Sequence, residues 1–214
     1  MIKVGEIYET NNYGTLEVIE YVNSGMVRVR FIDTGYEKYT QAGNIHRGGV
    51  KDLLAPSVWG VGYLGMGPYR AYIDTEQTKV YTTWKGMLER CYSVKCQSKH
   101  PTYKGCTVVE TWHNFQVFAE WFETHYIEGY ELDKDTLVEG NKVYGPDTCM
   151  FITRAENMII ARAVTAIFRS PAGEKYEVYN VAQFSREQGL HQGHLIAVKN
   201  GKRKTHKGWT KWPD

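Results

Sequence analysis

Residues 174–198 read EKYEVYNVAQFSREQGLHQGHLIAV, and their pattern predicts the fold of the end of the chain. It opens with a short alternating run that is typical of a strand. Asn180 can then cap a helix that ends at Gly189, because asparagine accepts from free backbone amides and glycine tolerates the left-handed conformation that closes helices. A second helix from Leu190 to Asn200 carries its apolar residues on one face. Two short helices joined at a glycine predict a helix-turn-helix.

The first residues of the second helix are the predicted base-reading residues. In a helix-turn-helix the amino-terminal end of the second helix enters the major groove of double-stranded DNA. That geometry places His191, Gln192 and His194 at the base edges, where the Gln192 amide can pair with adenine. We therefore expect double-stranded DNA as the partner of this segment.

The basic charge of the chain is concentrated just beyond this helix. Residues 199–214 contain six lysines or arginines against one aspartate, a net charge of +5 in a chain whose total is +2, so the remainder is near −3. Such a segment can bind phosphates and makes binding depend on salt. A helical hairpin with a solvated basic tail is the alternative. The predicted phosphate-binding side chains are Lys199, Lys202, Arg203, Lys204 and Lys207.

The first 55 residues alternate apolar and polar side chains over short runs. Val27, Val29 and Phe31 form one such run, and turns that contain asparagine and glycine separate the runs. This spacing predicts short antiparallel strands in a small SH3-like or Tudor-like β-barrel. Some barrels of this kind bind nucleic acids or proteins and others only pack, so a binding partner for residues 1–55 stays open.

The middle of the chain is predicted to be helical. Trp84, Leu88 and Cys91 recur at helical spacing, and Phe115 and Phe118 do the same further along the chain. These side chains are expected to form a core, because an apolar stripe on a helix usually faces the protein interior.

Residues 131–157 change to a pattern of strand, loop, strand and helix start. Thr153 and Glu156 match a capping box, in which the threonine hydroxyl accepts from the Glu156 amide while the carboxylate reaches back to the Thr153 amide. A helix that begins there has Asn157 on its first turn.

The expected fold class is therefore α+β, in three parts. The parts are a small N-terminal β-barrel over residues 1–55, a central α+β domain over residues 56–165, and a basic helix-turn-helix module over residues 166–214. Residues 56–69 are rich in glycine but lack the Lys-Ser/Thr of a phosphate-binding loop, so we expect them to connect the first two parts.

Composition and cysteine usage indicate the compartment. The start of the chain, MIKVGEIYET, lacks the layout of a signal peptide, and no apolar run approaches the roughly 18–20 residues that span a bilayer. We expect a cytoplasmic protein with free thiols and no membrane partner. Cys91, Cys96, His100 and Cys106 lie close together in sequence, but without a CxxC knuckle their spacing fits no common zinc finger.

Several segments resemble bacteriophage HNH homing endonucleases. Residues 168–190, FRSPAGEKYEVYNVAQFSREQGL, and residues 199–209, KNGKRKTHKGW, are similar to the nuclease-associated modular repeats that follow the catalytic domain of those enzymes. The motif LDKD at 132–135 and the run GNKVYGPDTCMFITRAEN at 140–157 look like their His-Me finger, a ββα unit. With the helices WKGMLERCY and WHNFQVFAEWF, the resemblance covers roughly residues 80–212.

The resemblance implies a divalent metal and hydrolysis of a DNA phosphodiester. In the family an aspartate and an asparagine of the ββα unit hold one metal ion, and a histidine beside that aspartate activates water. Carried over to this sequence, the metal ligands are Asp133 and Asn157. Hard oxygen ligands imply Mg²⁺, and no organic cofactor is implied.

Two positions of the motif differ from the family. Lys134 stands where the general-base histidine is expected, and Thr148 stands where the central asparagine is expected. A protonated lysine can contact the scissile phosphate but cannot accept a proton from water. Asp135 is then the alternative base, so the predicted catalytic residues are Asp133, Lys134, Asp135 and Asn157.

Two functions from different classes follow. The first is a phage-type DNA-binding protein of HNH homing-endonuclease descent that nicks or cuts DNA with Mg²⁺. The second is a catalytically inactive phage protein, either a DNA-binding regulator or a factor that engages a host protein through residues 1–55. For the ββα segment, a DNA-binding hairpin with carboxylates that only form a turn is the structural alternative. Loss of cleavage on Asp133→Ala with DNA binding retained would separate the nuclease from the regulator.

Overall fold

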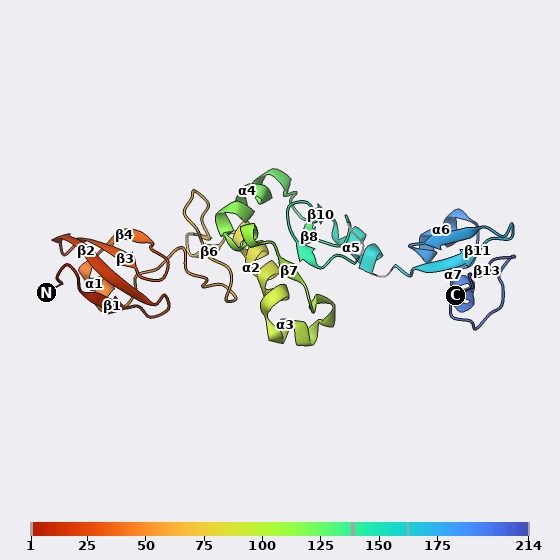
Figure 1. The fold of residues 1–214 in the computed structure, drawn as a ribbon. Helices are drawn as coiled ribbons and strands as arrows, with labels where there is room; N and C mark the ends of the chain where they lie inside the picture. Colours follow the sequence, from red (N-terminus) through yellow and green to blue (C-terminus); the bar gives the residue numbers. More distant parts are fainter. Residues whose placement is uncertain (1, 138–139, 162, 214) are drawn as a thin grey trace. The chain divides into compact units, whose positions relative to one another are not determined.

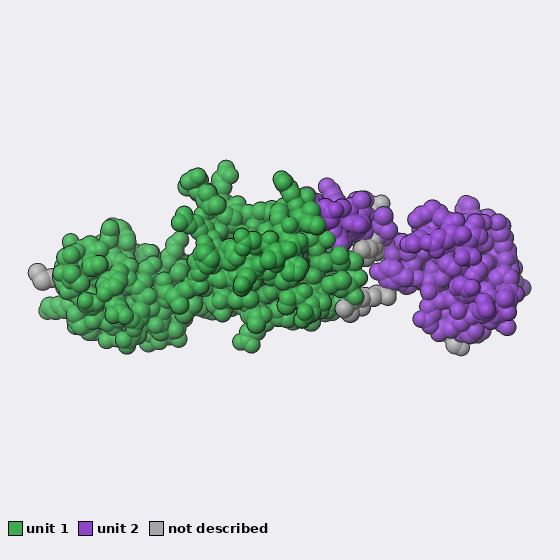
Figure 2. Space-filling model, turned by 90° about the horizontal axis from the view of Figure 1, so that it is seen from above, with its two compact units in different colours: residues 1–128, 132–151 green, residues 129–131, 152–214 purple. Residues whose placement is uncertain are grey.

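The computed structural model describes residues 2–137, 140–161 and 163–213, with the backbone alone at 160 and 161 (Figure 1). The chain divides into two compact units, coloured separately in Figure 2. The first unit contains residues 1–128 and 132–151, and the second contains residues 129–131 and 152–214. Each unit is described by itself.

Helices and strands are mixed throughout, as expected for an α+β protein. The strands are β1 (Ile7–Glu9), β2 (Thr15–Asn23), β3 (Met26–Phe31), β4 (Glu37–Thr40), β5 (Tyr72–Ile73), β6 (Glu76–Gln77), β7 (Thr107–Val108), β8 (Glu131–Asp133), β9 (Val143–Tyr144), β10 (Met150–Ile152), β11 (Ala166–Arg169), β12 (Lys175–Val178) and β13 (Thr210–Lys211). The helices are α1 (Ala42–His46), α2 (Lys79–Tyr92), α3 (Val94–Lys99), α4 (Phe115–His125), α5 (Arg154–Ala161), α6 (Val181–Glu187) and α7 (Gln192–Lys199), with 3₁₀ turns η1 (Pro101–Tyr103) and η2 (Glu110–His113).

The N-terminal sheet is open and does not close into a barrel. Its strands pair in the antiparallel order β1-β2-β3-β4, and within the described residues β1 does not pair with β4. The prediction of a closed β-barrel over residues 1–55 is therefore not supported. The segment after β4 forms the short helix α1 instead of a further strand, and its buried Ile45 packs into the core of the sheet. Closure of a barrel needs further strand pairing, and this helix occupies that part of the chain.

The central helices form where the spacing of apolar residues predicted them. Trp84 of α2 and Phe115 and Phe118 of α4 are fully buried, and the Trp84 indole N–H donates to the carbonyl oxygen of Trp112 at 2.7 Å. The glycine-rich segment packs against these helices, because a Cβ added at Gly62 would come within 2.4 Å of a Leu88 carbon. This segment is therefore part of the packed structure as well as a connection.

The ββα segment has the predicted local elements. Strands β8 and β10 are neighbours in a two-stranded sheet, and α5 follows β10. The predicted loop between them also contains β9, a short strand that pairs in parallel with β7. The capping box is confirmed: the Glu156 amide donates to the Thr153 hydroxyl at 3.2 Å, and the Thr153 amide donates to the Glu156 carboxylate at 2.8 Å.

The C-terminal module, residues 166–211, combines a small sheet with two helices. β11 lies between β12 and β13, and both pairings are antiparallel. The predicted first helix is confirmed as α6: the Asn180 side chain accepts from the Gln183 amide at 3.1 Å, and Gly189, just past the helix end, has φ +61°. The second helix starts at Gln192, two residues later than the predicted Leu190.

The basic end of the chain is folded, in contrast to the alternative of a solvated tail. Trp209 is buried in the module core, and strand β13 follows it. The core of the module consists of Ala166, Phe168, Val178, Val181, Leu195, Val198 and Trp209. The three-part division of the chain at residues 55 and 165 stays a prediction.

No helix within the described ranges has both the length and the apolar content needed to cross a membrane.

Candidate nucleic-acid interface

The loop after α7 folds back onto the start of the same helix. The Arg203 amide donates to the Ala197 carbonyl at 3.1 Å, and the Lys207 ammonium donates to the Gly189 carbonyl at 2.9 Å. The backbone amide of His191 donates to the Nε2 atom of His206 at 3.1 Å. Two of the predicted phosphate-binding residues, Arg203 and Lys207, therefore lie near the predicted base-reading residues.

The predicted base-reading residues are all exposed. His191, Gln192 and His194 are accessible to solvent at the first turn of α7. The rings of His191 and His194 lie 4.4 Å apart between centroids. Their exposure is what contact with a groove requires, because a base edge can be reached only by a side chain that is not packed into the module.

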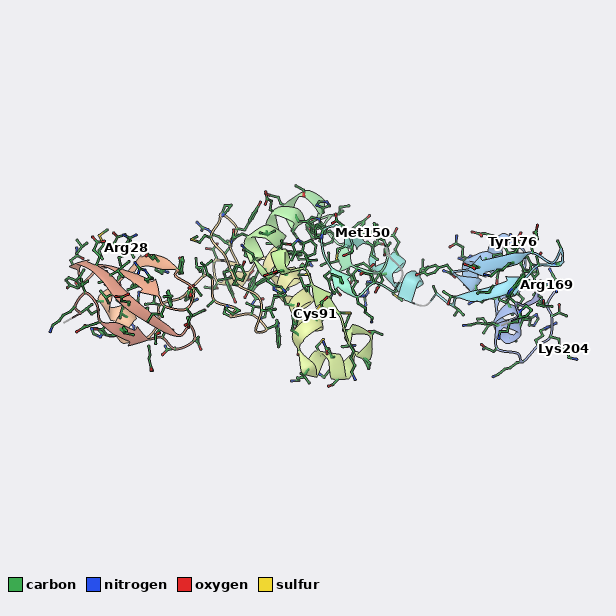
Figure 3. The ribbon with its side chains drawn as sticks, viewed as in Figure 1. Arg28, Cys91, Met150, Arg169, Tyr176 and Lys204 are labelled. Atoms are coloured by element: carbon green, nitrogen blue, oxygen red, sulfur yellow. The ribbon has the colours of Figure 1, made fainter. Side chains whose placement is uncertain are left out.

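The cations of the loop differ in how they are engaged. Lys202 and Lys204 are exposed, and the side chain of Lys204 is labelled in Figure 3. The Arg203 Nε atom donates to the Thr205 carbonyl at 2.8 Å, so part of its guanidinium stabilises the loop. Lys207 likewise connects the loop to the turn between the helices. Lys202 and Lys204 are therefore the cations best placed to bind a polyanion without loss of a contact in the loop.

His206 is a residue that the sequence did not single out. It is buried, and its ring lies 4.9 Å from that of His194. Desolvation, followed by the positive charges of its neighbours, lowers the pKa of His206 below the usual 6.5. Desolvation and the charge of Arg203 lower the pKa of His194 in the same way. Both rings are therefore neutral at pH 7. A neutral ring is what His206 needs, because its Nε2 atom accepts a hydrogen bond from the His191 amide.

We expect the C-terminal module to lose stability as the pH falls below about 6.5. Because the pKa of His206 is lower in the folded state, the unfolded module binds the proton more tightly. The contribution of the neutral ring is fully present above the unfolded value of 6.5 and is lost as the pH drops towards the folded value. Hydrogen exchange of the amides of residues 166–211 between pH 7.5 and pH 5 measures this, after correction for the intrinsic exchange rate.

The matched control for this prediction is His206→Gln. A glutamine side-chain oxygen can still accept from the His191 amide, but it does not titrate. The variant is expected to flatten the pH dependence. An equally steep dependence in wild type and variant would assign the effect to other groups.

Asp133 is the residue of the ββα segment that is held most firmly. It lies at the end of β8 with 9% of its surface exposed. Its Oδ2 atom accepts from the amides of Asp135 and Thr136 at 2.8 and 2.7 Å, and from the Thr136 hydroxyl at 2.6 Å. This carboxylate therefore fixes the turn that follows the strand, whatever else it binds.

Lys134 and Asp135 form an ion pair. The Lys134 side chain is buried, and its ammonium donates to Asp135 Oδ1 at 2.5 Å and to the Asn141 carbonyl at 2.7 Å. The ring of Tyr144 lies 5.9 Å from the same nitrogen atom. A contact between Lys134 and a scissile phosphate stays a prediction, and these intramolecular bonds do not favour it. The role of Asp135 as a general base also stays a prediction. The ion pair of its carboxylate with Lys134 does not favour that role.

Asn157 lies on the first turn of α5, as the capping box predicted. This helix belongs to the second unit. The Asn157 Nδ2 atom donates to the Glu131 carboxylate at 3.1 Å. Asp133 belongs to the first unit. The two metal ligands implied by the resemblance thus belong to different units.

Asp133 and Asn157 are the two metal ligands that the resemblance implies. Within the part of the chain that the structure describes, no group of three or more His, Cys, Asp or Glu side chains is arranged to hold a metal ion. Mg²⁺ usually takes one or two carboxylates together with water and substrate phosphates, and Asp133 and Asn157 would supply one carboxylate and one amide. Thr148 replaces the third family position, and its hydroxyl donates to the Val143 carbonyl at 2.7 Å.

We expect Asp133→Ala to destabilise the first unit by about 2–3 kcal/mol, because hydrogen bonds to a charged group of low exposure are lost and two amides lose their acceptor. Asp133→Asn keeps an acceptor oxygen and is expected to cost about half as much. Urea unfolding of the full-length variants measures both values. If Asp133→Ala unfolds at the wild-type urea concentration, the carboxylate does not hold the turn. Because of this structural role, Asp133→Asn is the cleaner variant for any test of activity.

Comparisons with known proteins add little to this site. No protein-family model matches the chain, and no curated protein matches it. One solved structure, on DNA binding and cleavage by the HNH homing endonuclease I-HmuI, is similar to it at 16% identity over 97% of this chain and 86% of that chain, with a TM-score of 0.23. At this TM-score the likeness does not transfer a residue role to this chain.

Proposed function

We propose that this protein binds double-stranded DNA through its C-terminal module. The supporting observation is the loop after α7, which is bonded onto the first turn of that helix. A cationic loop and an exposed helix start then face the same ligand: Lys202 and Lys204 contact phosphates, and His191, Gln192 and His194 contact base edges. The resemblance of residues 168–209 to DNA-binding repeats of homing endonucleases supports the same function.

The test is fluorescence anisotropy of a labelled DNA duplex with the full-length protein, over salt concentrations from 50 to 300 mM. Each phosphate that a lysine or arginine neutralises adds about 0.9 to the slope of log affinity against log salt. With four or five contacts we expect a slope of about −4. A slope near zero would contradict the proposal, because the basic loop would then make no phosphate contact.

A second candidate function is Mg²⁺-dependent nicking of DNA. The observation that favours it is the strand-strand-helix arrangement of β8, β10 and α5, with Asp133 fixed at the end of a strand. The missing general-base histidine and the ion pair of Lys134 count against it. Supercoiled plasmid incubated with Mg²⁺, and in parallel with chelator, tests this function. Nicking that is lost in Asp133→Asn and in Asn157→Ala would support it, and intact plasmid in the presence of duplex binding would leave the DNA-binding regulator.

A host protein as partner of the N-terminal sheet stays a prediction. Recovery of a specific protein by the full-length chain, lost when residues 1–55 are removed, is its test.

A further inference from the structure

A cavity of about 650 Å³ lies beside α2 and α3 in the first unit. Its size is within the range of sites for small organic ligands, which is roughly 300–1,000 Å³. The lining combines cations and aromatic rings, and the residues on which the argument rests are Trp59, Arg90, Lys95, Lys99, His100 and Tyr103. Such a combination is suited to a ligand that has both a flat ring and a negative charge.

The positive charge of the cavity is available to a ligand. Arg90, Lys95 and Lys99 line it, and in the described ranges of the chain none of the three forms an ion pair. The Arg90 side chain is already hydrogen-bonded to Tyr144, so the charges that a ligand can reach freely are those of the two lysines. Glu89 is the acidic residue of the lining. Lys95 and Lys99 are exposed and lie four residues apart on α3. The net charge therefore favours an anion, and two flexible ammonium groups can follow a phosphate.

The aromatic rings of the cavity differ in how they are used. Tyr103 already has the Arg90 guanidinium over its ring at 5.8 Å and the His100 ring at 6.1 Å. Trp59 is 38% exposed, and no aromatic neighbour is found for it among the described residues. The Trp59 ring therefore has a face on which a planar ligand can stack.

The backbone conformation of Trp59 is a second feature typical of a ligand-binding position. Its φ angle is +53°, in the left-handed region that glycine adopts without steric cost. The turn is closed by hydrogen bonds between Val58 and Gly62, at 2.9 and 2.8 Å. A tryptophan in this conformation costs free energy, and with 38% of its surface exposed the side chain recovers only part of that cost by packing. Strain of this kind is found at ligand-binding positions.

We propose that this cavity binds an unpaired nucleotide, with its base stacked on Trp59 and its phosphate at Lys95 and Lys99. Stacking on an aromatic ring does not require a particular base, and a cationic groove follows the backbone of a single strand. The ligand is either one nucleotide of an unpaired DNA strand or a free mononucleotide. The inference does not depend on duplex binding by the C-terminal module.

Cys96 lines the cavity and allows a local measurement. It is half-buried, whereas the other three cysteines are buried. Burial raises the pKa of Cys91 to about 12 and that of Cys149 to about 11, so these thiols resist alkylation at pH 7.5. The alkylation rate of Cys96 in the full-length protein, followed by mass spectrometry of the modified peptide, therefore reports on occupation of the cavity.

Gly86 provides a variant that fills the cavity without removing a charge. It lies on α2 and lines the cavity, and a Cβ added there meets no atom within 4 Å. Gly86→Leu is expected to project a side chain into this space, and leucine favours a helix over glycine. Gly86→Ala has the same benefit for the helix but is too small to block the cavity, so it is the matched control.

The experiment compares three probes: a single-stranded oligodeoxynucleotide of about twelve nucleotides, AMP, and inorganic tripolyphosphate. We expect the oligonucleotide to slow alkylation of Cys96 in wild type and in Gly86→Ala, and to have at least a tenfold weaker effect in Gly86→Leu. Protection by AMP at a similar concentration per nucleotide would identify a free nucleotide as the source of the ligand. Protection by neither probe, protection by tripolyphosphate equal to that by the oligonucleotide, or equal protection in Gly86→Leu would overturn the proposal.

Trp59 variants test the stacking partner. Trp59→Gly removes the ring and relieves the left-handed backbone, so the lost packing and the relieved strain partly offset each other and the melting temperature is expected to change little. The oligonucleotide concentration that protects Cys96 is expected to rise about tenfold, within the range measured for loss of base stacking. Trp59→Phe keeps a ring and is expected to stay within about threefold of wild type. Equal protection in Trp59→Gly and wild type would overturn the assignment of Trp59.

Discussion

Trp209→Ala is expected to unfold the C-terminal module within an otherwise folded chain. Trp209 is 7% exposed and packs against the rings of Tyr176 and Phe184, each with 5.0 Å between centroids. Replacement of a buried tryptophan by alanine costs about 3–5 kcal/mol. A core of this size supplies little more than 3–5 kcal/mol in total, so the variant should retain no stable module.

Hydrogen exchange of the amides of residues 166–211 in the full-length protein measures the effect locally. We expect protection to be lost in β11 and β12 and to be unchanged in α2 and α4. Trp212→Ala is the matched control, because Trp212 is half-buried and is outside the core cluster of the module. Its expected cost is about 1 kcal/mol. If Trp209→Ala keeps its protected amides, the basic end is not an integral part of the module.

The buried position of Trp209 also affects the use of truncated variants. Removal of residues 199–214 would test DNA binding cleanly only if these residues formed a solvated tail. The structure places Trp209 in the core and pairs β13 with β11, so the truncation would also unfold the module. Loss of DNA binding in the truncated chain would therefore not identify phosphate contacts.

Local sequence signals predicted the helices and their caps well. Asn180 and Gly189 bound α6, and the pair Thr153 and Glu156 bounds α5. These motifs act within a few residues of themselves, because a cap is a hydrogen bond to the next turn of the chain. The sequence alone is sufficient where the partner is that close.

Signals that depend on distant partners were missed. A run of lysines left a solvated end open as an alternative, but the indole of Trp209 packs against rings of β12 and α6. The alternation of apolar and polar side chains in the first 55 residues predicted strands, but it does not indicate whether the last strand pairs with the first. Lys134 was predicted to contact a phosphate, whereas its ammonium donates to the adjacent Asp135 and to the Asn141 carbonyl, and a run of charged residues does not indicate which of them pair. Such pairings are decided by tertiary structure.

The cavity could not be read from the sequence for the same reason. Trp59 precedes α2 by twenty residues, and the lysines of α3 follow it, so the spacing of these side chains in the chain suggests no common site. A tryptophan followed by glycine in a glycine-rich segment was the available signal. It indicates a turn, but it does not indicate what the turn faces.

The triple variant Lys199→Gln, Lys202→Gln and Lys204→Gln is expected to weaken binding of a DNA duplex roughly 150-fold at 0.15 M salt. The estimate follows from a loss of about 2.7 in the slope of log affinity against log salt, at about 0.9 per phosphate contact. These side chains are chosen because no described contact in the loop depends on them, whereas Arg203 and Lys207 donate to backbone carbonyls. Lys202 and Lys204 are exposed, whereas Lys199 is half-buried in the last turn of α7, where a cation stabilises the helix end. The three substitutions are expected to cost about 1 kcal/mol in total, so the module should stay folded.

The control removes the same charge elsewhere in the chain: Lys3→Gln, Lys51→Gln and Lys104→Gln replace three exposed lysines of the first unit. These substitutions remove no charge from the C-terminal module itself. The control is expected to keep the wild-type salt slope and an affinity within about threefold. Equal loss in both variants would mean that the DNA responds to the total charge of the chain. A loss confined to the first variant would place the phosphates at the loop after α7, against the helix start that is proposed to contact the bases.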